Sequence, residues 1–180
     1  MTCAPDDHAT LVLKLGSSVL RTQADLPRAV HAIYREWRHG RRVVAVVSAL
    51  GSTTDELLGS ARQFVASPHP SSLAALLATG ETTAAALLTL ALQRSGIPAT
   101  LLDAAAAGLR TRGDALDAEP VALDTESIRR ALATGSVVVV PGFSGRDDAG
   151  ATTLLGRGGS DLTAVFLARE LRAACTLLKD

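Results

Sequence analysis

The sequence contains few aromatic residues, few cysteines and no excess of either charge. Only 3% of its 180 residues are aromatic, which leaves little material for a platform on which nucleic-acid bases could stack. Lys plus Arg number 18 and Asp plus Glu also number 18, so no basic excess favours nucleic acid or an anionic membrane. Cys3 and Cys175 are far apart and form no CxxC pair, which argues against a zinc site or a disulfide framework. These absences predict a cytoplasmic protein with no nucleic-acid partner.

Long apolar segments are missing as well. Residues 1–10 carry Asp6 and Asp7 and lack a basic region followed by an apolar run, so they predict an N-terminal tail rather than a signal peptide. The longest mainly apolar stretch, residues 84–92, is too short to cross a bilayer. No membrane partner is therefore expected.

Alternating apolar runs and amphipathic segments indicate an α/β fold. Near-continuous Val and Leu runs at 11–15, 43–47 and 136–140 are typical of parallel strands that are covered on both faces. Weaker strand signals lie at 99–102 and from 176. The apolar spacing and the turn signals predict helices at 26–37, 53–65, 71–78, 81–95, 124–133 and 162–172. This alternation predicts a three-layer α/β/α sandwich with a mostly parallel sheet, in one domain over residues 11–180.

Two segments are less regular. Residues 109–124 carry strand and turn signals that predict no definite order, and Asp124 is expected to cap the helix that follows. Turn residues at 141–142 and 147–150 flank short segments that predict a hairpin over the site.

Polar residues directly after each apolar run are the site candidates, because ligands of open α/β sheets gather at the carboxyl ends of the strands. At the first of these ends, Lys14 precedes Gly16, Ser17 and Ser18. These residues suit a phosphate group, since they offer a point charge, close backbone approach and hydroxyl donors. The alternative is a solvent-facing lysine beside an ordinary turn.

Two further candidates lie at the second strand end and at a predicted helix start. Ser48 directly follows the 43–47 run, whereas Thr53 or Thr54 after it could simply cap the next helix. Glu81 stands at the predicted start of helix 81–95, where the helix dipole favours a carboxylate whatever its function. A carboxylate held rigidly there could also bind the ammonium group of a substrate.

The richest candidate is Gly-Arg-Gly-Gly-Ser-Asp at 156–161. Its glycines let the backbone approach an anion, and the N–H groups at the start of the following helix favour anionic oxygens. Arg157 can bind a carboxylate in bidentate fashion, and Asp161 can accept from an ammonium or orient a reacting group. Alternatively, the segment only connects a strand to a helix. The four histidines lie near the terminus, between prolines or at exposed-looking positions, which argues against a histidine-dependent hydrolase.

Together, these segments resemble the aspartate kinases of the amino-acid kinase superfamily over nearly the whole chain. Residues 14–18, KLGSS, resemble the family's K-F-G-G-T-S. Residues 48–58, SALGSTTDELL, resemble V-S-A-M-G-x-T-T-D-x-L-L, and 79–81, TGE, resemble S-x-G-E. Residues 152–161, TTLLGRGGSD, resemble T-T-L-G-R-G-G-S-D with one additional leucine, and this match is the most specific.

The resemblance implies the amino-acid kinase fold and ATP-dependent phosphorylation of the β-carboxylate of L-aspartate, which begins lysine, threonine and methionine biosynthesis. It implies ATP and Mg²⁺ as cofactors, no metal-ligating side chain, and catalytic roles for Lys14 and Asp161. The residues along the nucleotide phosphates would be Lys14, Gly16, Ser17, Ser18, Gly158 and Gly159. The residues that position aspartate would be Ser48, Thr54, Glu81, Arg157 and Ser160. In that arrangement Glu81 faces the substrate ammonium and Arg157 a carboxylate.

Two departures from the family pattern leave alternatives open. Ser17 occupies the place of the family's second glycine, and residues 14–20 alone look as much like glutamate 5-kinase. The chain also ends at Asp180, where the family continues into a V-D-G segment and residues that bind the nucleotide base and ribose. We therefore expect a kinase domain that is truncated on its nucleotide side, within a full-length parent that could be a homo-oligomer. The other interpretation is a non-catalytic or regulatory kinase-like domain fused to homoserine dehydrogenase.

Overall fold

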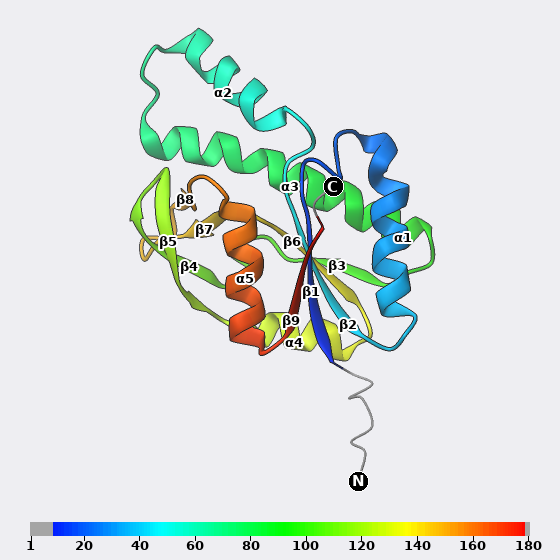
Figure 1. Ribbon diagram of the computed structural model, residues 1–180. Coiled ribbons are helices and arrows are strands. Elements are labelled where there is room, and N and C mark those ends of the chain that lie inside the picture. The colour runs from blue at the N-terminus through cyan, green and yellow to red at the C-terminus, as the bar shows by residue number, and fades with distance from the viewer. Residues whose placement is uncertain (1–8, 179–180) are drawn as a thin grey trace.

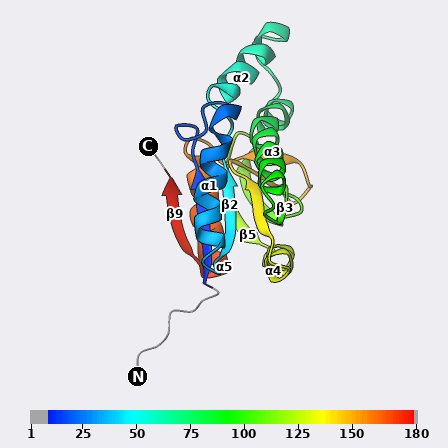
Figure 2. The same ribbon diagram turned by 90° about the vertical axis from the view of Figure 1, so that its right-hand side faces the viewer.

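The computed structural model describes residues 9–178, and its centre is a five-stranded parallel sheet, sheet A. The strands lie in the order β3-β6-β2-β1-β9, with β9 at one edge and β3 at the other (Figure 2). Their bounds are Thr10–Leu15 for β1, Arg42–Val47 for β2, Ala99–Leu101 for β3, Val137–Pro141 for β6 and Ala174–Leu178 for β9. The strands predicted from the Val and Leu runs are confirmed. The predicted tail lies almost wholly outside the described residues.

Helices cover both faces of sheet A (Figure 1). Helices α1 (Leu26–Trp37) and α3 (Pro70–Arg94) pack on one face, and α4 (Thr125–Ala133) and α5 (Gly159–Leu171) pack on the other. Successive strand residues point to opposite faces, so each apolar run supplies both cores at once. In β2, for example, Val43 lies in the α1 and α3 core, whereas Val44 lies in the α4 and α5 core. The predicted three-layer α/β/α architecture is confirmed.

Residues 70–94 form one continuous helix, so the prediction of two helices at 71–78 and 81–95 is wrong. Gly80 lies within this helix, where α3 packs against the loop after β2. A Cβ built on Gly80 would lie 3.1 Å from the Cβ of Ala49. Glu81 therefore stands in the middle of α3 rather than at a helix start. The helix dipole acts mainly within the first and last turns, so it does not account for a carboxylate at this position.

A second sheet, sheet B, lies beside α5 (Figure 1). Its order is β5-β4-β7-β8, and its strands are β4 (Leu109–Asp114), β5 (Asp117–Leu123), β7 (Ser144–Arg146) and β8 (Thr152–Leu154). The segment without a predicted order is an antiparallel hairpin of β4 and β5. The hairpin predicted after β6 is confirmed as β7 and β8.

The remaining helix boundaries follow local capping. Helix α2 (Thr53–Phe64) matches its predicted span, and Asp124 caps α4 by accepting a hydrogen bond from the N–H of Glu126 at 3.0 Å. A short 3-10 turn, η1 (Gln23–Asp25), precedes α1. Helix α5 begins at Gly159, earlier than predicted, because Gly158 takes the left-handed conformation as its N-cap.

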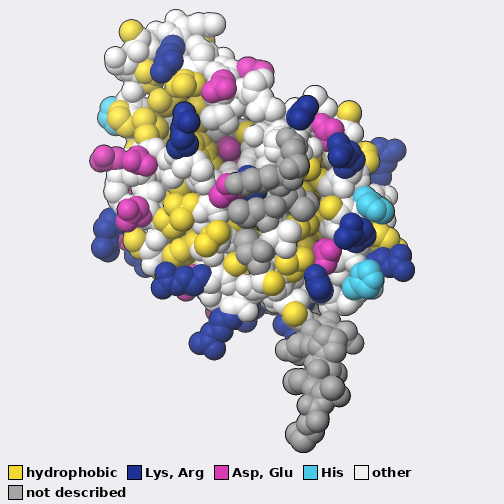
Figure 3. Space-filling model, viewed as in Figure 1, with side chains coloured by type: hydrophobic (Ala, Val, Ile, Leu, Met, Phe, Trp, Pro, Cys, Tyr) yellow, Lys and Arg dark blue, Asp and Glu magenta, His cyan; other side chains and the backbone are white. Residues whose placement is uncertain are grey.

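Helix α3 is long and apolar enough, by length and composition alone, to cross a membrane. The core helix of a globular protein passes the same test. In this fold its buried side chains include Ala84, Leu88 and Leu92, which pack in the core beneath α1. On the face shown in Figure 3, Lys and Arg side chains are spread over the surface and interspersed with acidic ones.

Candidate functional site

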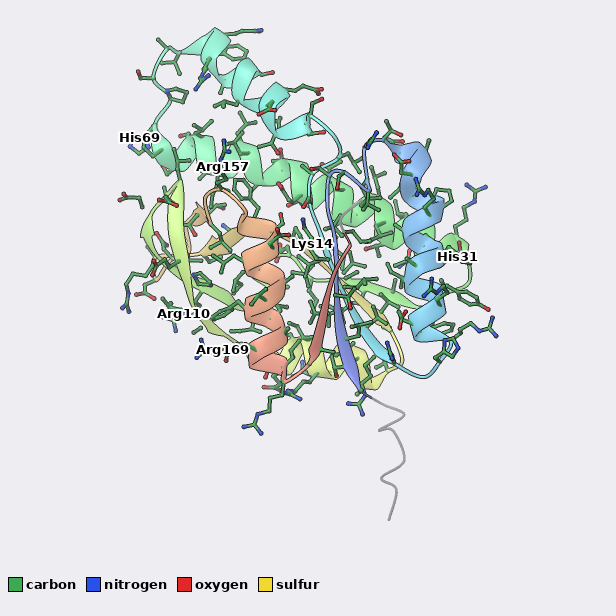
Figure 4. All side chains as sticks on the ribbon, viewed as in Figure 1. Lys14, His31, His69, Arg110, Arg157 and Arg169 are labelled. Atoms are coloured by element: carbon green, nitrogen blue, oxygen red, sulfur yellow. The ribbon has the colours of Figure 1, made fainter. Side chains whose placement is uncertain are left out.

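A cavity of about 340 Å³ opens where the carboxyl ends of β1, β2 and β6 meet α3 and the start of α5. Its lining residues are Lys14, Ser17, Ser48, Ala49, Gly51, Thr54, Glu81, Phe143, Gly156, Arg157, Gly158, Gly159, Ser160 and Asp161. Every residue predicted for the site except Gly16 and Ser18 lines this cavity. Figure 4 shows Lys14 at the end of β1 and Arg157 near the start of α5, whereas His31 lies away from both on α1. Neither His31 nor His69 lines the cavity. The four separate sequence segments therefore form one site.

Lys14 and Asp161 form an ion pair across the floor of the cavity. The Nζ of Lys14 lies 2.7 Å from Oδ1 of Asp161, which is in the first turn of α5. Lys14 is 7% exposed, so the alternative of a solvent-facing lysine is wrong. The negative carboxylate is also favourably placed near the positive end of α5.

Glu81 brings a second carboxylate to the cavity from α3. Its Oε1 accepts a hydrogen bond from the backbone N–H of Ala49 at 3.3 Å. Its Oε2 is buried and has no hydrogen-bond partner among the described residues. Burial raises the pKa of Glu81 to about 7, and the hydrogen bond from Ala49 offsets part of that rise. A buried oxygen without a partner is costly, and an ammonium group entering the cavity would satisfy it.

Residues 156–158 form a turn with two left-handed glycines, and residues 159–161 begin α5. Gly156 has φ +64° and Gly158 has φ +77°, a region that residues with a Cβ rarely adopt. Arg157, between them, is exposed and lines the cavity. The Arg157 guanidinium and the Glu81 carboxylate bring opposite charges to the cavity. Such a pair can hold an amino acid by its carboxylate and its ammonium group.

The turns after β1 and β2 complete the wall. The carbonyl of Gly16 accepts hydrogen bonds from the N–H groups of Val19 and Leu20, at 3.1 and 2.9 Å, so Gly16 and Ser18 support the turn while Ser17 reaches the cavity. Thr54 does not cap α2. The N-cap is Ser52, whose side chain makes no capping hydrogen bond, and Thr54 lines the cavity instead.

A larger cavity of about 570 Å³ lies at the opposite, amino-terminal edge of sheet A. Arg41, Arg42 and Trp37 are among its lining residues, but no carboxylate is. Because its charges are of one sign and the glycine-rich turns are at the other edge, the smaller cavity is the better candidate for an amino-acid site.

The model of the amino acid kinase family matches residues 9–180. The chain belongs to this family. The aspartokinase of Geobacillus stearothermophilus is 39% identical over 171 residues, which make up 94% of this chain and 42% of that protein. The aspartate kinase of Synechocystis is 35% identical with a TM-score of 0.78, and the match covers 94% of this chain and 28% of that one. The resemblance to aspartate kinases is thus confirmed.

The fold is also shared with a more distant structure, E. coli aspartokinase III in complex with aspartate and ADP. That structure has a TM-score of 0.78 at 21% identity, over 95% of this chain and 49% of its own. The present amino acid kinase chain spans about 42% of the length of the curated relatives it matches.

Sequence reasoning assigned no individual role to Ala49, Gly51 or Phe143, and it treated Gly156 only as one of the glycines of the 156–161 segment, although all four line the cavity of this amino acid kinase chain. Ala49 and Gly51 lie in the loop after β2, so the rule that ligands gather at strand ends could have found them. Gly156 lies in the glycine-rich segment itself. Phe143 gave no signal, because its place depends on a positive φ of 67° that nothing in its residue type predicts.

Proposed function

We propose that this chain supplies the amino-acid-binding side of a kinase that phosphorylates the β-carboxylate of L-aspartate. The observation that carries the proposal is the single cavity that holds Lys14, Asp161, Glu81 and Arg157, with Oε2 of Glu81 lacking a partner. The names of the relatives, aspartokinase and aspartate kinase, support the same activity, and E. coli aspartokinase III has been crystallised with aspartate and ADP.

In the proposed complex, Glu81 accepts hydrogen bonds from the substrate ammonium, and Arg157 binds the α-carboxylate. Ser48, Thr54 and Ser160 donate to the remaining substrate oxygens. The β-carboxylate oxygen attacks the γ-phosphorus of ATP, the bond to the bridging oxygen breaks, and aspartyl phosphate and ADP result. The attacking group is already an anion, so no base is needed. Lys14 lowers the barrier by neutralising charge on the transferred group, while Asp161 holds the Lys14 ammonium in place.

The nucleotide phosphates would lie along Gly16, Ser17, Ser18, Gly158 and Gly159. Among the described residues no group of three or more His, Cys, Asp or Glu side chains gathers at one point. Mg²⁺ usually keeps several waters and is bound through substrate phosphates with one or two carboxylates, so the proposed ion would be held mainly by the nucleotide. When bound, the ion neutralises phosphate charge.

The activity belongs to a longer protein in the relatives, so we assign residues 11–180 the aspartate side of the site and propose that further residues complete the nucleotide side. Cytoplasmic location and homo-oligomers of such a longer protein remain predictions. The alternatives are a glutamate-specific kinase and a kinase-like domain that binds its amino acid without turnover.

Calorimetric titration tests the substrate assignment directly on this chain. We expect L-aspartate to bind, and Glu81→Gln and Arg157→Ala each to weaken binding about 10-fold to 100-fold, because each removes a charge-assisted hydrogen bond. Succinate has both carboxylates but no ammonium group, so it should bind the wild-type chain weakly. The substitution Glu81→Gln should leave the affinity for succinate unchanged.

Three ligand outcomes separate the candidate functions. Preference for L-glutamate over L-aspartate would support the glutamate kinase and reject the aspartate assignment. Equal heats for the wild type and Arg157→Ala would remove Arg157 from the substrate site. Aspartate binding without aspartyl phosphate formation, measured in a longer protein that contains this chain, would favour the regulatory domain.

A further inference from the structure

The turn between β6 and β7 forms one wall of the cavity and contains a strained residue. Phe143 has φ +67°, which costs a residue with a Cβ about 1–2 kcal/mol. The N–H of Ser144 donates to the carbonyl of Gly142 at 2.8 Å and closes a tight turn around Phe143. Such a conformation persists only where its surroundings hold it.

This turn lies directly against the first turn of α5, with no space between them. A Cβ on Gly142 would lie 2.7 Å from the Cβ of Ser160, and a Cβ on Gly159 would lie 2.8 Å from Cδ2 of Phe143. Any movement of the β6–β7 turn would therefore displace the residues at the start of α5. Those residues include Ser160 and Asp161, which line the cavity.

The hydroxyl of Thr163 joins these two segments. Its Oγ1 accepts a hydrogen bond from the N–H of Phe143 at 3.1 Å and donates one to the carbonyl of Gly159 at 2.9 Å. Thr163 is completely buried, so water cannot replace either bond. The donation alone is ordinary, because Thr89 on α3 donates to the carbonyl four residues before it in the same way. The bond from Phe143 is the unusual one, since it ties the strained turn to α5.

We propose that Thr163 is a positioning residue for the amino-acid site: its hydroxyl holds the strained Phe143 turn against the first turn of α5 and so fixes Ser160 and Asp161 for the substrate. The effect on substrate rests on the function proposed above, whereas the hold on the turn does not. Thr163 lies behind the cavity wall and does not line the cavity.

Three variants test this role. Thr163→Val keeps the shape of the side chain and removes the hydroxyl, Thr163→Ser keeps the hydroxyl, and Thr89→Val is a matched control that removes a buried threonine hydroxyl outside the cavity lining. Two quantities are measured for each: the hydrogen-exchange rate of the Phe143 amide, by NMR, and the dissociation constant of L-aspartate, by calorimetry. Thermal unfolding shows that each variant is folded at the temperature used. If Thr163→Val does not fold, Thr163→Ala takes its place.

We expect Thr163→Val to speed exchange of the Phe143 amide at least about 10-fold and to weaken aspartate binding about 10-fold, because the part-buried N–H of Phe143 loses its hydrogen-bond partner. Thr163→Ser should restore both quantities, and Thr89→Val should change neither even if it lowers the melting temperature. The proposal is overturned if Thr163→Val leaves the exchange rate of the Phe143 amide unchanged. It is also overturned if Thr89→Val weakens aspartate binding as much as Thr163→Val does. A wild-type chain that does not bind aspartate contradicts the proposed function, but the exchange rates still decide whether Thr163 holds the turn.

Discussion

Helix α5 and helix α3 each supply one wall of the cavity, and each wall carries one carboxylate. The surroundings of these two carboxylates differ. On the α5 wall, Asp161 stands in the first turn of the helix and 2.7 Å from the ammonium of Lys14. On the α3 wall, Glu81 is in mid-helix, 4% exposed, and receives one hydrogen bond from Ala49. Asp161 has a cation beside it, whereas Glu81 has one oxygen without a partner.

This difference indicates a division of labour within the site. A carboxylate that is already ion-paired fixes the position of its lysine and has less charge to offer a ligand. A buried carboxylate without a cation is strained in its ionised form and gains most when a ligand supplies the cation. The α3 wall is therefore suited to recognise a substrate ammonium, and the α5 wall to hold the lysine that faces a phosphoryl group.

The largest expected effect concerns the pH dependence of stability through Glu81. Its carboxyl titrates near 4.5 in the unfolded chain and near 7 in the folded one. Between these values the folded state binds more protons than the unfolded state, so stability falls as pH rises through this window and is level above about pH 8. The decline should be on the order of 3 kcal/mol. Urea unfolding from pH 4.5 to 8, in the wild type and in Glu81→Gln, measures the difference.

Bound aspartate should oppose the fall of stability with rising pH, because its ammonium group stabilises the ionised Glu81 carboxylate. Affinity for aspartate should therefore rise from pH 6 to pH 8, and binding near pH 6.5 should release protons, which calorimetry in buffers of different ionisation enthalpy detects. If the stability difference between wild type and Glu81→Gln is the same at every pH, Glu81 is ionised throughout and the contrast between the two walls fails.

The second effect concerns the α5 wall, which carries the Lys14–Asp161 ion pair. Lys14→Met removes the ammonium that lies 2.7 Å from Asp161 and should lower the free energy of unfolding by about 2 kcal/mol, less than for a fully buried pair because Asp161 is 30% exposed. Adding Asp161→Asn should recover part of the loss. Denaturant unfolding of both single variants and the double variant gives the coupling energy. Additive losses would mean that the two side chains are held independently.

The α5 wall was more accessible to sequence reasoning than the α3 wall. The central sheet, the parallel direction of its strands and the strand-end sites follow from local patterns, namely the Val and Leu runs and the polar residues after them. The glycines of residues 156–161 predict a turn, and the positive φ values at Gly156 and Gly158 confirm it.

The α3 wall depends on contacts that local patterns do not contain. Two helices, 71–78 and 81–95, were predicted here, but in the fold Gly80 lies within α3 and allows it to approach Ala49, a contact across 31 positions of the chain. The same packing sets the burial of Glu81 and hence its raised pKa. Sequence reasoning missed Phe143 and Thr163 for a similar reason. Their hydrogen bond joins residues 20 positions apart, and local patterns do not contain such a contact.

The smallest effect tests why α3 carries a glycine beside Glu81. Gly80→Ala adds a methyl group 3.1 Å from the Cβ of Ala49, which is closer than most Cβ contacts in proteins. The loop after β2 must therefore shift. This shift moves the Ala49 N–H away from the Glu81 carboxylate that accepts its hydrogen bond. Aspartate affinity should fall about 3-fold, while the stability change stays within about 1 kcal/mol because alanine is also the better helix former.

Gly59→Ala in α2 is the matched control for this substitution, because a Cβ there meets nothing within 4 Å. It should stabilise the chain by about 0.5–1 kcal/mol and leave aspartate affinity unchanged. Calorimetric titration and denaturant unfolding of the two variants give both quantities. If Gly80→Ala stabilises the chain as much as Gly59→Ala and binds aspartate as the wild type does, the close approach at Gly80 does not position Glu81, and the α3 wall owes its geometry to other contacts.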